Sequence, residues 1–321
     1  LTKISRKYGI KVIFFDGRGG PPARGGGNTH QFYSALGNLV ESEQIQITVQ
    51  GQTISSNFGT IDSSQYNLEQ LISSGVKNKI ISDKEIFTGS HRRTLNKLSE
   101  ISYKSYSDFK LHPKFVPYLE HMSTVKYYAK TNIGSRPSKR SNDDVFSFES
   151  LRAIPFVGSW SQLKQNVPGF FGLGTAINYF NENKRLNEVK KLYKEVPFFR
   201  ALVSNSMMSL TKSFFQLTSY MKHDPEFGAF WDIIHDEYLL TKKMLLKVSG
   251  FTELMQNEPA NKLSIQTREN IVLPLITIQQ FALQNIKELN TVKNNIKKIN
   301  VYEKMVMRSL FGNINASRNS A

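Results

Sequence analysis

The sequence has no cysteine among its 321 residues and no long uninterrupted apolar run. Without cysteine there is no disulfide and no thiolate metal site. A membrane-spanning helix needs about 18 consecutive apolar residues, and no segment approaches that length. The first residues, LTKISRKYGIKVIFF, lack an initiator methionine and the layout of a signal peptide. These absences predict a cytoplasmic protein without a membrane partner, and we expect an amino-terminal part to precede the first residue.

The composition contains enough apolar material for a large core, with 39% hydrophobic residues, 22 Phe and 13 Tyr. Basic residues outnumber acidic ones by 42 to 26, and a net charge of +16 would attract any polyanion. However, Lys190, Lys191 and Lys194 alternate with Val189 and Leu192 at helical spacing, which is typical of a solvated helix face. We therefore expect no nucleic-acid partner, while a basic helical protein that binds nucleic acid stays open as an alternative.

Three short segments have the character of strands. The run from Val12 to Phe15 is apolar enough for burial on both faces, as in a parallel sheet, and it follows the end of a helix at Gly9, which suits a left-handed C-cap. Residues 10–15 are therefore expected to form a strand that needs neighbours. The other candidates are residues 44–52, which alternate, and residues 151–160, which are apolar but interrupted by Pro155.

Most of the remaining sequence has helical periodicity, with prolines 197, 225 and 259 marking breaks. The polar segment 131–148, rich in Gly, Pro and Ser, is expected to be a loop. No internal repeat is evident. The expected helices cover residues 63–74, 90–109, 183–196, 199–222, 227–248 and 265–298.

The stretch DGRGGPPARGGG, residues 16–27, follows the first expected strand. A dinucleotide fingerprint that starts at Gly17 would need glycine where Pro22 stands, and a P-loop would need a lysine that this stretch lacks. What remains is a loop that brings backbone N–H groups and two guanidinium groups, Arg18 and Arg24, close to a phosphate or carboxylate. A structural turn or an RNA-binding segment are the alternatives. The loop glycines are Gly17, Gly19, Gly20, Gly25 and Gly26.

Two further arginines stand out from the lysine background. Arg136 lies in GSRPSKR within the polar loop, and Arg152 opens the apolar segment in ESLRAIPF. An arginine beside a buried strand must be paired or functional, because a buried unpaired charge is costly. An ion pair of Arg152 with Glu149 is the structural alternative, and a solvated loop charge is the alternative for Arg136.

Six motifs occur in an order that resembles the carboxyl-terminal part of phosphoenolpyruvate carboxylases: FFDGRGGPPARGGGNTH, ITVQGQTISSNFG, GSRPSKR, ESLRAIPFVGSWSQ, VPGFFGLGTA and the terminal RNSA. The resemblance covers essentially the whole chain. It implies a biotin-independent lyase that joins bicarbonate to phosphoenolpyruvate and gives oxaloacetate and phosphate. An inactive relative of such an enzyme is a further alternative.

The resemblance also implies a fold that is mainly α with a few parallel strands: the last strands of a (β/α)8 TIM-like barrel plus a carboxyl-terminal helical bundle. Residues 1–180 would supply barrel and active-site loops, and residues 181–321 a helical region continuous with the barrel. The full-length enzyme would be a cytoplasmic homotetramer that replenishes the tricarboxylic acid cycle.

The resemblance assigns roles to the arginines. Arg18 and Arg152 would hold the phosphoryl group, Arg136 would support the same site, and Arg24 would lie on a mobile loop above it. Fixed guanidinium groups suit this chemistry, since negative charge persists throughout the reaction. An inhibitor such as aspartate or malate would be held by Arg24, Lys212, Arg268 and Asn319.

This sequence departs from the pattern of the family at two points, the metal ligands and a proton-transfer residue. The family uses Mg²⁺ or Mn²⁺, whose carboxylate ligands are expected upstream of this chain. It also commonly has histidine where Asp16 stands, which leaves the role of that position open. The adjacent residues His235, Asp236 and Glu237 would point in different directions from one helix, so they are expected to be surface residues rather than a replacement metal site.

Overall fold

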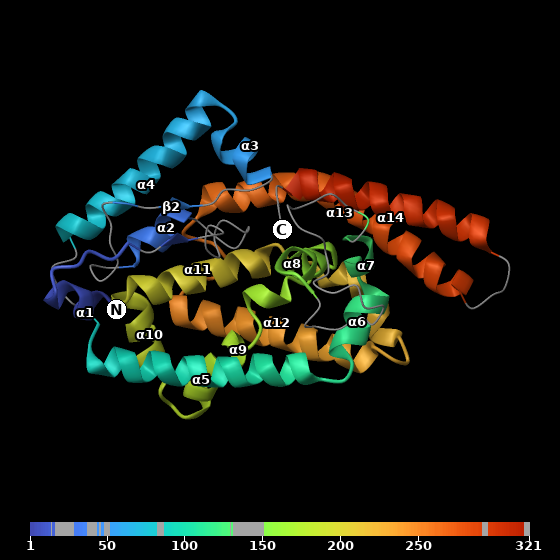
Figure 1. The fold of residues 1–321 in the computed structure, drawn as a ribbon. Helices are drawn as coiled ribbons and strands as arrows, with labels where there is room; N and C mark the ends of the chain where they lie inside the picture. Colours follow the sequence, from blue (N-terminus) through green and yellow to red (C-terminus); the bar gives the residue numbers. More distant parts are fainter. Residues whose placement is uncertain are drawn as a thin grey trace.

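The computed structural model describes residues 1–13, 15–16, 29–36, 44, 46–47, 52–81, 87–128, 130, 151–290 and 295–317. This part of the chain is mainly helical (Figure 1). In chain order, its elements are α1 (Thr2–Lys7), β1 (Phe15–Asp16), α2 (Thr29–Ser34), β2 (Gln46–Ile47), α3 (Gln52–Phe58), α4 (Ile61–Ile81), α5 (Gly89–Leu111), α6 (Phe115–Met122), α7 (Val125–Tyr128), α8 (Ala153–Gln162), the 3-10 helix η2 (Val167–Gly169), α9 (Leu173–Glu182), α10 (Leu186–Glu195), α11 (Pro197–Thr211), the 3-10 helix η3 (Phe215–His223), α12 (Gly228–Ser249), α13 (Pro259–Asn290) and α14 (Ile296–Ser317).

The two short strands pair in parallel, with Phe15 opposite Gln46 and Asp16 opposite Ile47. Gly9 follows α1 with φ +67°, so the left-handed helix end expected there is confirmed. The expectation of a buried strand over residues 10–15 is wrong for residues 10–13. Residues 10–13 are not strand, and Ile10 and Ile13 are 58% and 42% exposed. Among the described residues the sheet has two strands, so no further strand there covers these side chains.

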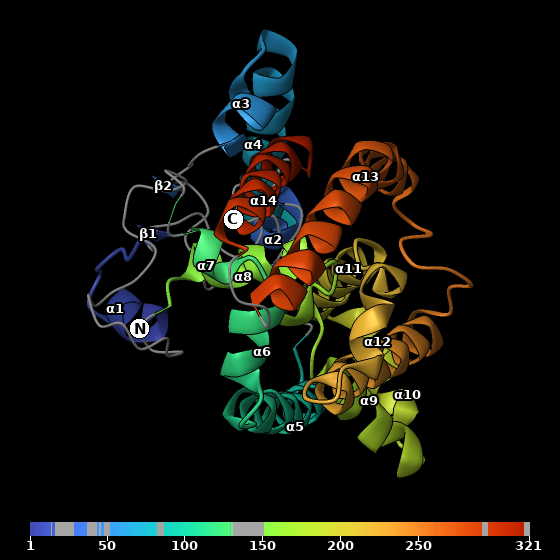
Figure 2. The same ribbon diagram turned by 90° about the vertical axis from the view of Figure 1, so that its right-hand side faces the viewer.

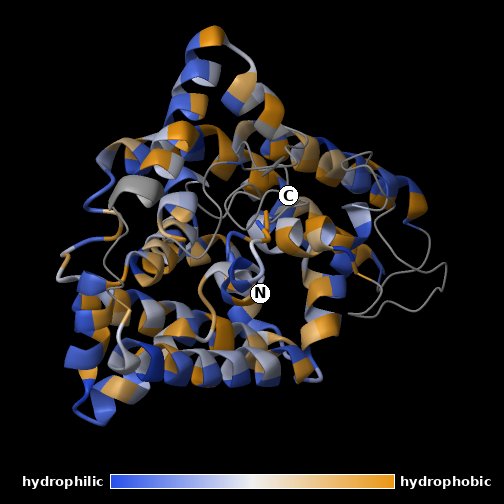
Figure 3. Cartoon of the chain, turned by 60° about the vertical axis from the view of Figure 1, so that its left-hand side comes forward, coloured by the Kyte–Doolittle hydropathy of each residue, from blue (hydrophilic) through white to orange (hydrophobic). Residues whose placement is uncertain are grey.

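The largest core lies among α5, α9, α10, α11 and α12, which form the lower part of the molecule in Figure 1. Each helix contributes one apolar stripe, as α10 does with Leu186, Val189 and Leu192. In Figure 3 hydrophilic and hydrophobic residues alternate along the helices. The periodicity that predicts helices in the ranges of α5, α10, α11 and α12 thus also indicates which face is buried, whereas α9 was not among the expected helices.

The second core is aromatic and lies where α6 and α8 meet the start of α12. Phe109 stacks on Phe230 with ring centroids 5.1 Å apart, and Phe115 lies edge-on to Phe109 at 5.2 Å. Trp160 of α8 is fully buried beside them. Burial of such large rings supplies much of the hydrophobic stabilisation of this region.

The segment expected to be a strand over residues 151–160 is instead helix α8, so that prediction is wrong. Pro155 lies in the first turn, where a backbone N–H has no partner within the helix, so the proline does not interrupt it. Gly158 lets α8 approach α7, since a Cβ there would lie 2.1 Å from the Tyr128 hydroxyl. A short apolar run fits a buried strand and a buried helix equally well, which is why periodicity failed here.

Two expected helices are each divided in the structure. The helix expected over residues 199–222 ends at Thr211, and the chain continues as η3 from Phe215. The helix expected over residues 265–298 is an antiparallel hairpin of α13 and α14, which extends to one side in Figure 1 and runs obliquely in Figure 2. The sequence around the connection between the two helices, residues 288–298, contains no proline or glycine. It therefore carries no local signal for a break in the expected helix.

Candidate functional site

Most residues of the predicted catalytic loop lie outside the part of the chain that the structure describes. These are Arg18, Arg24 and Gly17, Gly19, Gly20, Gly25 and Gly26 of the loop, together with Arg136 and Asn319. The backbone of Asp16 belongs to β1. Arg152, Lys212 and Arg268 are described, and the site is built from them.

Arg152 precedes the first turn of α8 as its N-cap residue, with an extended backbone (φ −94°, ψ 157°). Its neighbour Leu151 is 8% exposed, and the arginine itself is partly buried. Arg152 therefore lies at the start of a helix and not in a strand. Glu149, the alternative ion-pair partner, lies outside the described residues.

Lys212 and Arg268 line one pocket, although 56 positions separate them in the sequence. We call this the anion pocket. It lies between the turn after α8, the end of α11, the first half of α13 and the end of α14. Its lining residues are Ser161, Lys164, Asn166, Lys212, Ile265, Arg268, Glu269, Val272, Asn313 and Ser317.

The turn after α8 places a further lysine in this pocket. Lys164 and Asn166 have left-handed backbones, with φ of 54° and 45°, and the N–H groups of Gln165 and Asn166 donate to the carbonyl of Trp160. The carbonyl of Lys164 accepts from the N–H of Phe214 at 2.8 Å, which ties the turn to the end of α11. Apart from glycine, mainly Asn, Asp and His adopt this conformation, so it is uncommon for a lysine. The sequence analysis missed Lys164, which stands among polar residues in SQLKQN and carries no signal of its own.

Charge is concentrated in the anion pocket. Lys164 is 5% exposed at its side chain and pairs with Glu269 at 2.6 Å. Burial lowers the pKa of Lys164, and the pairing with Glu269 opposes that shift. Burial also lowers the pKa of Lys212 to about 8, and repulsion from Arg268 and Lys164 contributes. Three cations and one carboxylate therefore face each other, an arrangement that favours binding of an anion.

Arg268 links the pocket to the end of α14. Its Nη1 donates to the carbonyl of Ser317 at 3.3 Å, and its Nε donates to the carbonyl of Ser264 at 3.0 Å. Ser317 is the last described residue before Asn319. The structure therefore brings Lys212 and Arg268 together in one pocket that Ser317 also lines. Arg24 and Asn319, the other two members of the predicted set, lie outside the described residues.

A buried amide also belongs to the anion pocket. Asn313 of α14 is 2% exposed, and its Oδ1 has no hydrogen-bond partner among the described residues. Leaving such an atom without a partner is unfavourable, so a buried orphan acceptor indicates a place for a ligand or water. Sequence reasoning had no signal for Asn313.

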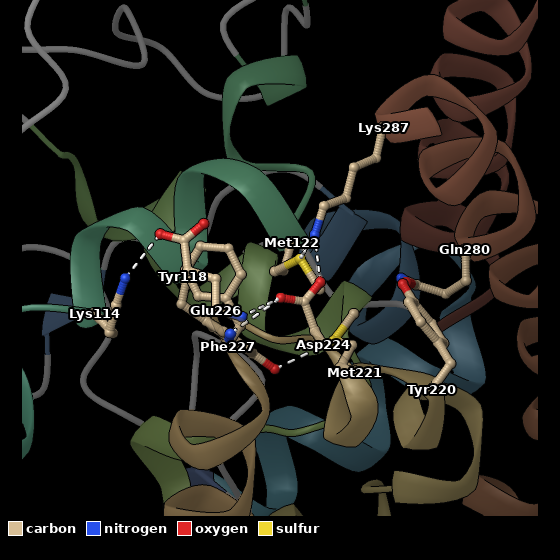
Figure 4. Close-up of polar contacts among 10 residues, drawn as sticks. All are labelled: Lys114, Tyr118, Met122, Tyr220, Met221, Asp224, Glu226, Phe227, Gln280 and Lys287. Carbon is tan, nitrogen blue, oxygen red and sulfur yellow. Dashed lines mark hydrogen bonds and ion pairs between the residues drawn. The ribbon is translucent and has the colours of Figure 1, made fainter. Parts of the chain in front are cut away.

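The hairpin that carries Arg268 and Asn313 is anchored to the rest of the molecule by Asp224 (Figure 4). Its Oδ1 accepts from the N–H groups of Glu226 and Phe227 at 3.0 and 3.1 Å, and its Oδ2 pairs with Lys287 of α13. Burial alone would raise the pKa of Asp224, but these contacts outweigh it and lower the pKa below its ordinary value. In the same view, Tyr220 donates to Gln280 of α13 at 2.9 Å.

Glu237 corrects one expectation, because it is buried rather than a surface residue. It is 7% exposed and accepts from the N–H groups of Gly172 and Thr175 at 3.0 and 3.1 Å and from the hydroxyl groups of Thr175 and Thr241. This carboxylate of α12 thus satisfies the N-terminus of α9, where the helix dipole favours negative charge. Gly172 has φ +88°, which explains a glycine at that position.

No cluster of three or more His, Cys, Asp or Glu side chains that could hold a metal ion occurs among the described residues. The groups present there do not fit Mg²⁺, so we derive no step through it. In the same part of the chain, no helix is sufficiently long and apolar to cross a membrane.

Comparison with known proteins identifies the class to which this arrangement belongs. The family model for phosphoenolpyruvate carboxylase matches residues 1–317. Two phosphoenolpyruvate carboxylases of Corynebacterium glutamicum are each 32% identical over 292 residues, which is 87% of this chain and 31% of the relative. The chain therefore belongs to the phosphoenolpyruvate carboxylase family. It spans about a third of the length of the curated relatives that it matches.

Proposed function

We propose that this chain is the carboxyl-terminal part of an enzyme that forms oxaloacetate and phosphate from phosphoenolpyruvate and bicarbonate. The observation that carries the proposal is the family match over residues 1–317. In this proposal Arg18 and Arg152 bind the phosphoryl oxygens, Arg136 supports that site, and Arg24 covers it. Guanidinium groups fixed in place stabilise the negative charge that passes from phosphoryl to enolate oxygens. When bound, Mg²⁺ or Mn²⁺ would stabilise the same charge from ligands upstream of this chain.

The proposal extends to the setting of the reaction. The enzyme would act in the cytoplasm as a homotetramer, with residues 1–180 in the barrel and residues 181–321 in a continuous helical region. Residue 180 lies within α9, and one core contains residues from both sides of it, such as Phe180 and Leu186. That continuity supports a helical region that is not an independent domain.

The experiment is an assay of the full-length polypeptide for oxaloacetate formation, coupled to malate dehydrogenase. Oxaloacetate should appear only when bicarbonate, phosphoenolpyruvate and a divalent cation are all present. A well-folded full-length protein that forms none under these conditions would be an inactive relative, and the proposed activity would be wrong.

We further propose that the anion pocket holds a dicarboxylate inhibitor, aspartate or malate, through Lys212 and Arg268 with Arg24 and Asn319. The convergence of Lys212 and Arg268 on one pocket supports this. Inhibition would follow because Arg24 cannot bind the inhibitor and cover the active site at once, so the inhibitor selects the uncovered state. The test is to titrate both dicarboxylates against the full-length enzyme, its Lys212→Ala variant and a variant truncated before Arg318. An insensitive wild type, or two variants as sensitive as the wild type, would contradict the assignment.

A further inference from the structure

Helix α13 exposes a face that carries no charge. The structure describes every residue from Leu263 to Phe281, and none of the exposed ones in this range is acidic or basic. Because an α-helix turns by about 100° per residue, these exposed positions fall within one arc of about 160°. We call this arc the uncharged face. It consists of Leu263, Ser264, Gln266, Thr267, Asn270, Ile271, Pro274, Thr277, Ile278 and Phe281.

Large apolar side chains run along the middle of the uncharged face. Leu263 and Ile271 are 63% and 59% exposed, and Ile278 and Phe281 are 46% and 54% exposed. Their spacing keeps them on one stripe of the helix. Exposed apolar side chains that gather in this way mark a surface that binds another molecule.

The charged residues of α13 before Glu288 make contacts outside the uncharged face. Arg268 donates to the carbonyl of Ser317. The others form ion pairs, which are Lys262 with Glu253, Glu269 with Lys164 and Lys287 with Asp224. The helix therefore carries charge, but none of it lies on the face that is open to solvent between Leu263 and Phe281.

Other helices with exposed apolar residues also expose charge. These exposed charged residues are Lys297, Lys298, Lys304 and Arg308 on α14, Asp236, Lys242, Lys243 and Lys247 on α12, and Asp62, Glu69 and Lys77 on α4. Depletion of charge together with aromatic and apolar residues is typical of the core of a protein–protein interface. Among these helices, α13 has the surface that fits such a core.

We propose that the uncharged face of α13 packs against the same face of a second copy of this chain, with the two helices antiparallel across a two-fold axis. Around such an axis a patch meets itself, so a charge in its middle would lie near the like charge of its copy. A chain with a net charge of +16 can self-associate through a surface that avoids this repulsion. A different partner would be selected for acidic groups opposite exposed basic ones, and the uncharged face offers none.

The stripe also has the symmetry that such a contact needs. The midpoint between Ile271 and Ile278 lies next to Pro274, so a two-fold axis there places Ile271 of one copy opposite Ile278 of the other. The inference rests on the homotetramer of the proposed function and names one of its contact surfaces. Its test is the mass of the assembly, which is separate from the proposed activity.

The first experiment measures the molar mass of the full-length protein by sedimentation equilibrium. The double variant Ile271→Glu with Ile278→Glu puts four like charges across the axis and should reduce the mass of the assembly to about half. Ile296→Glu with Val301→Glu is the matched control, because these residues are 71% and 58% exposed on α14 of the same hairpin. The control should keep the wild-type mass. Circular dichroism checks that both variants are folded.

The second experiment identifies what covers the face. A photoreactive benzoylphenylalanine replaces Thr277, which is exposed between the apolar residues, and it reacts with whichever chain lies against it. The expected product is a cross-link from position 277 to α13 of a second copy, whereas the same group in place of Lys304 on α14 should give no such product.

The outcomes separate the two proposals. A monomeric wild type would overturn both the inference and the homotetramer. A wild-type assembly whose mass the Ile271→Glu, Ile278→Glu variant leaves unchanged would overturn the inference alone. A cross-link from position 277 to an upstream part of the polypeptide or to another protein, or no cross-link, would also overturn it.

Discussion

At the scale of single residues, Lys212 shows how burial makes a lysine sensitive to pH. Burial and the neighbouring cations lower its pKa to about 8, so it is charged below that pH and loses its proton above it. Affinity for an anion should therefore be full below about pH 8 and fall as the pH rises, by up to about tenfold per pH unit for one linked proton.

The measurement is the dissociation constant of aspartate at several pH values on both sides of that pKa. Lys212→Arg is the control, because a guanidinium keeps its charge throughout the range, and its affinity should vary little with pH. The assignment fails if this variant shows the same fall as the wild type.

Arg152 is the second residue whose role can be tested directly. If its planar fork binds the phosphoryl oxygens in the full-length enzyme, Arg152→Lys should lower kcat/KM by about 100-fold or more, since a point charge cannot replace bidentate contacts. Steady-state kinetics with phosphoenolpyruvate as the varied substrate measure this. A variant with nearly normal kinetics would instead favour a structural ion pair.

Glu237 is a stabilising residue according to its contacts. Glu237→Ala leaves the N–H groups of Gly172 and Thr175 and the Thr241 hydroxyl without their acceptor in a buried place. The free energy of unfolding should fall by about 3 kcal/mol. Urea denaturation monitored by circular dichroism measures it, with the exposed neighbour in Asp236→Ala as control. Equal effects of the two changes would contradict the assigned role.

At the scale of elements, the position of the α13–α14 hairpin depends on Asp224. Its contacts lower its pKa below the ordinary value, so they stabilise the fold above about pH 4 and are lost as the pH falls through the lowered pKa. Asp224→Asn should lower the free energy of unfolding by about 1–2 kcal/mol at neutral pH, and this difference should vanish in acid.

Denaturation curves at several pH values measure the effect of Asp224→Asn. Asp232→Asn is a suitable control, because Asp232 is 43% exposed and lies 3.8 Å from Lys222 in a loose surface pair. Such exposed pairs contribute little. A gap between wild type and Asp224→Asn that is independent of pH would show that the carboxylate charge is not what holds α13.

The helices also show which elements can be read from local sequence. Residues 90–109 and 227–248 were expected to be helical, and the ends of α5 and α12 differ from these bounds by no more than two residues. Their apolar stripes run unbroken, so the period is clear. The division of the expected helix 265–298 into α13 and α14 instead depends on packing between the two arms of a hairpin, which no local pattern reports.

At the scale of the whole molecule, activity should require more than these 321 residues. The described residues offer no group of side chains that could hold a divalent cation, and the chain corresponds to about a third of its relatives. The 321-residue chain should therefore show no oxaloacetate formation when assayed alone, whereas the full-length polypeptide should be active. Measurable bicarbonate-dependent turnover by the isolated chain would contradict this.

The exposed apolar stripe on α4 belongs to the same scale. Ile61, Leu68, Ile72 and Val76 are each at least half exposed on a helix that stands away from the bundle in Figures 1 and 2. An apolar stripe at helical spacing is typical of a helix face that packs against another part of a protein. Its exposure shows that local patterning specified an amphipathic helix whose partner surface the described residues do not provide.

The sequence by itself determined the family and the long helices, because motifs such as GSRPSKR and unbroken helical periods are local properties of the chain. It also determined that Lys212 and Arg268 were candidates for one site, through resemblance alone. Only the tertiary structure decided that residues 153–162 are helical and that Glu237 is buried. It likewise decided that Lys164 forms an ion pair with Glu269, which lies 105 residues further along the chain. Such pairings follow from packing between elements that are distant in the sequence, so no single stretch of sequence predicts them.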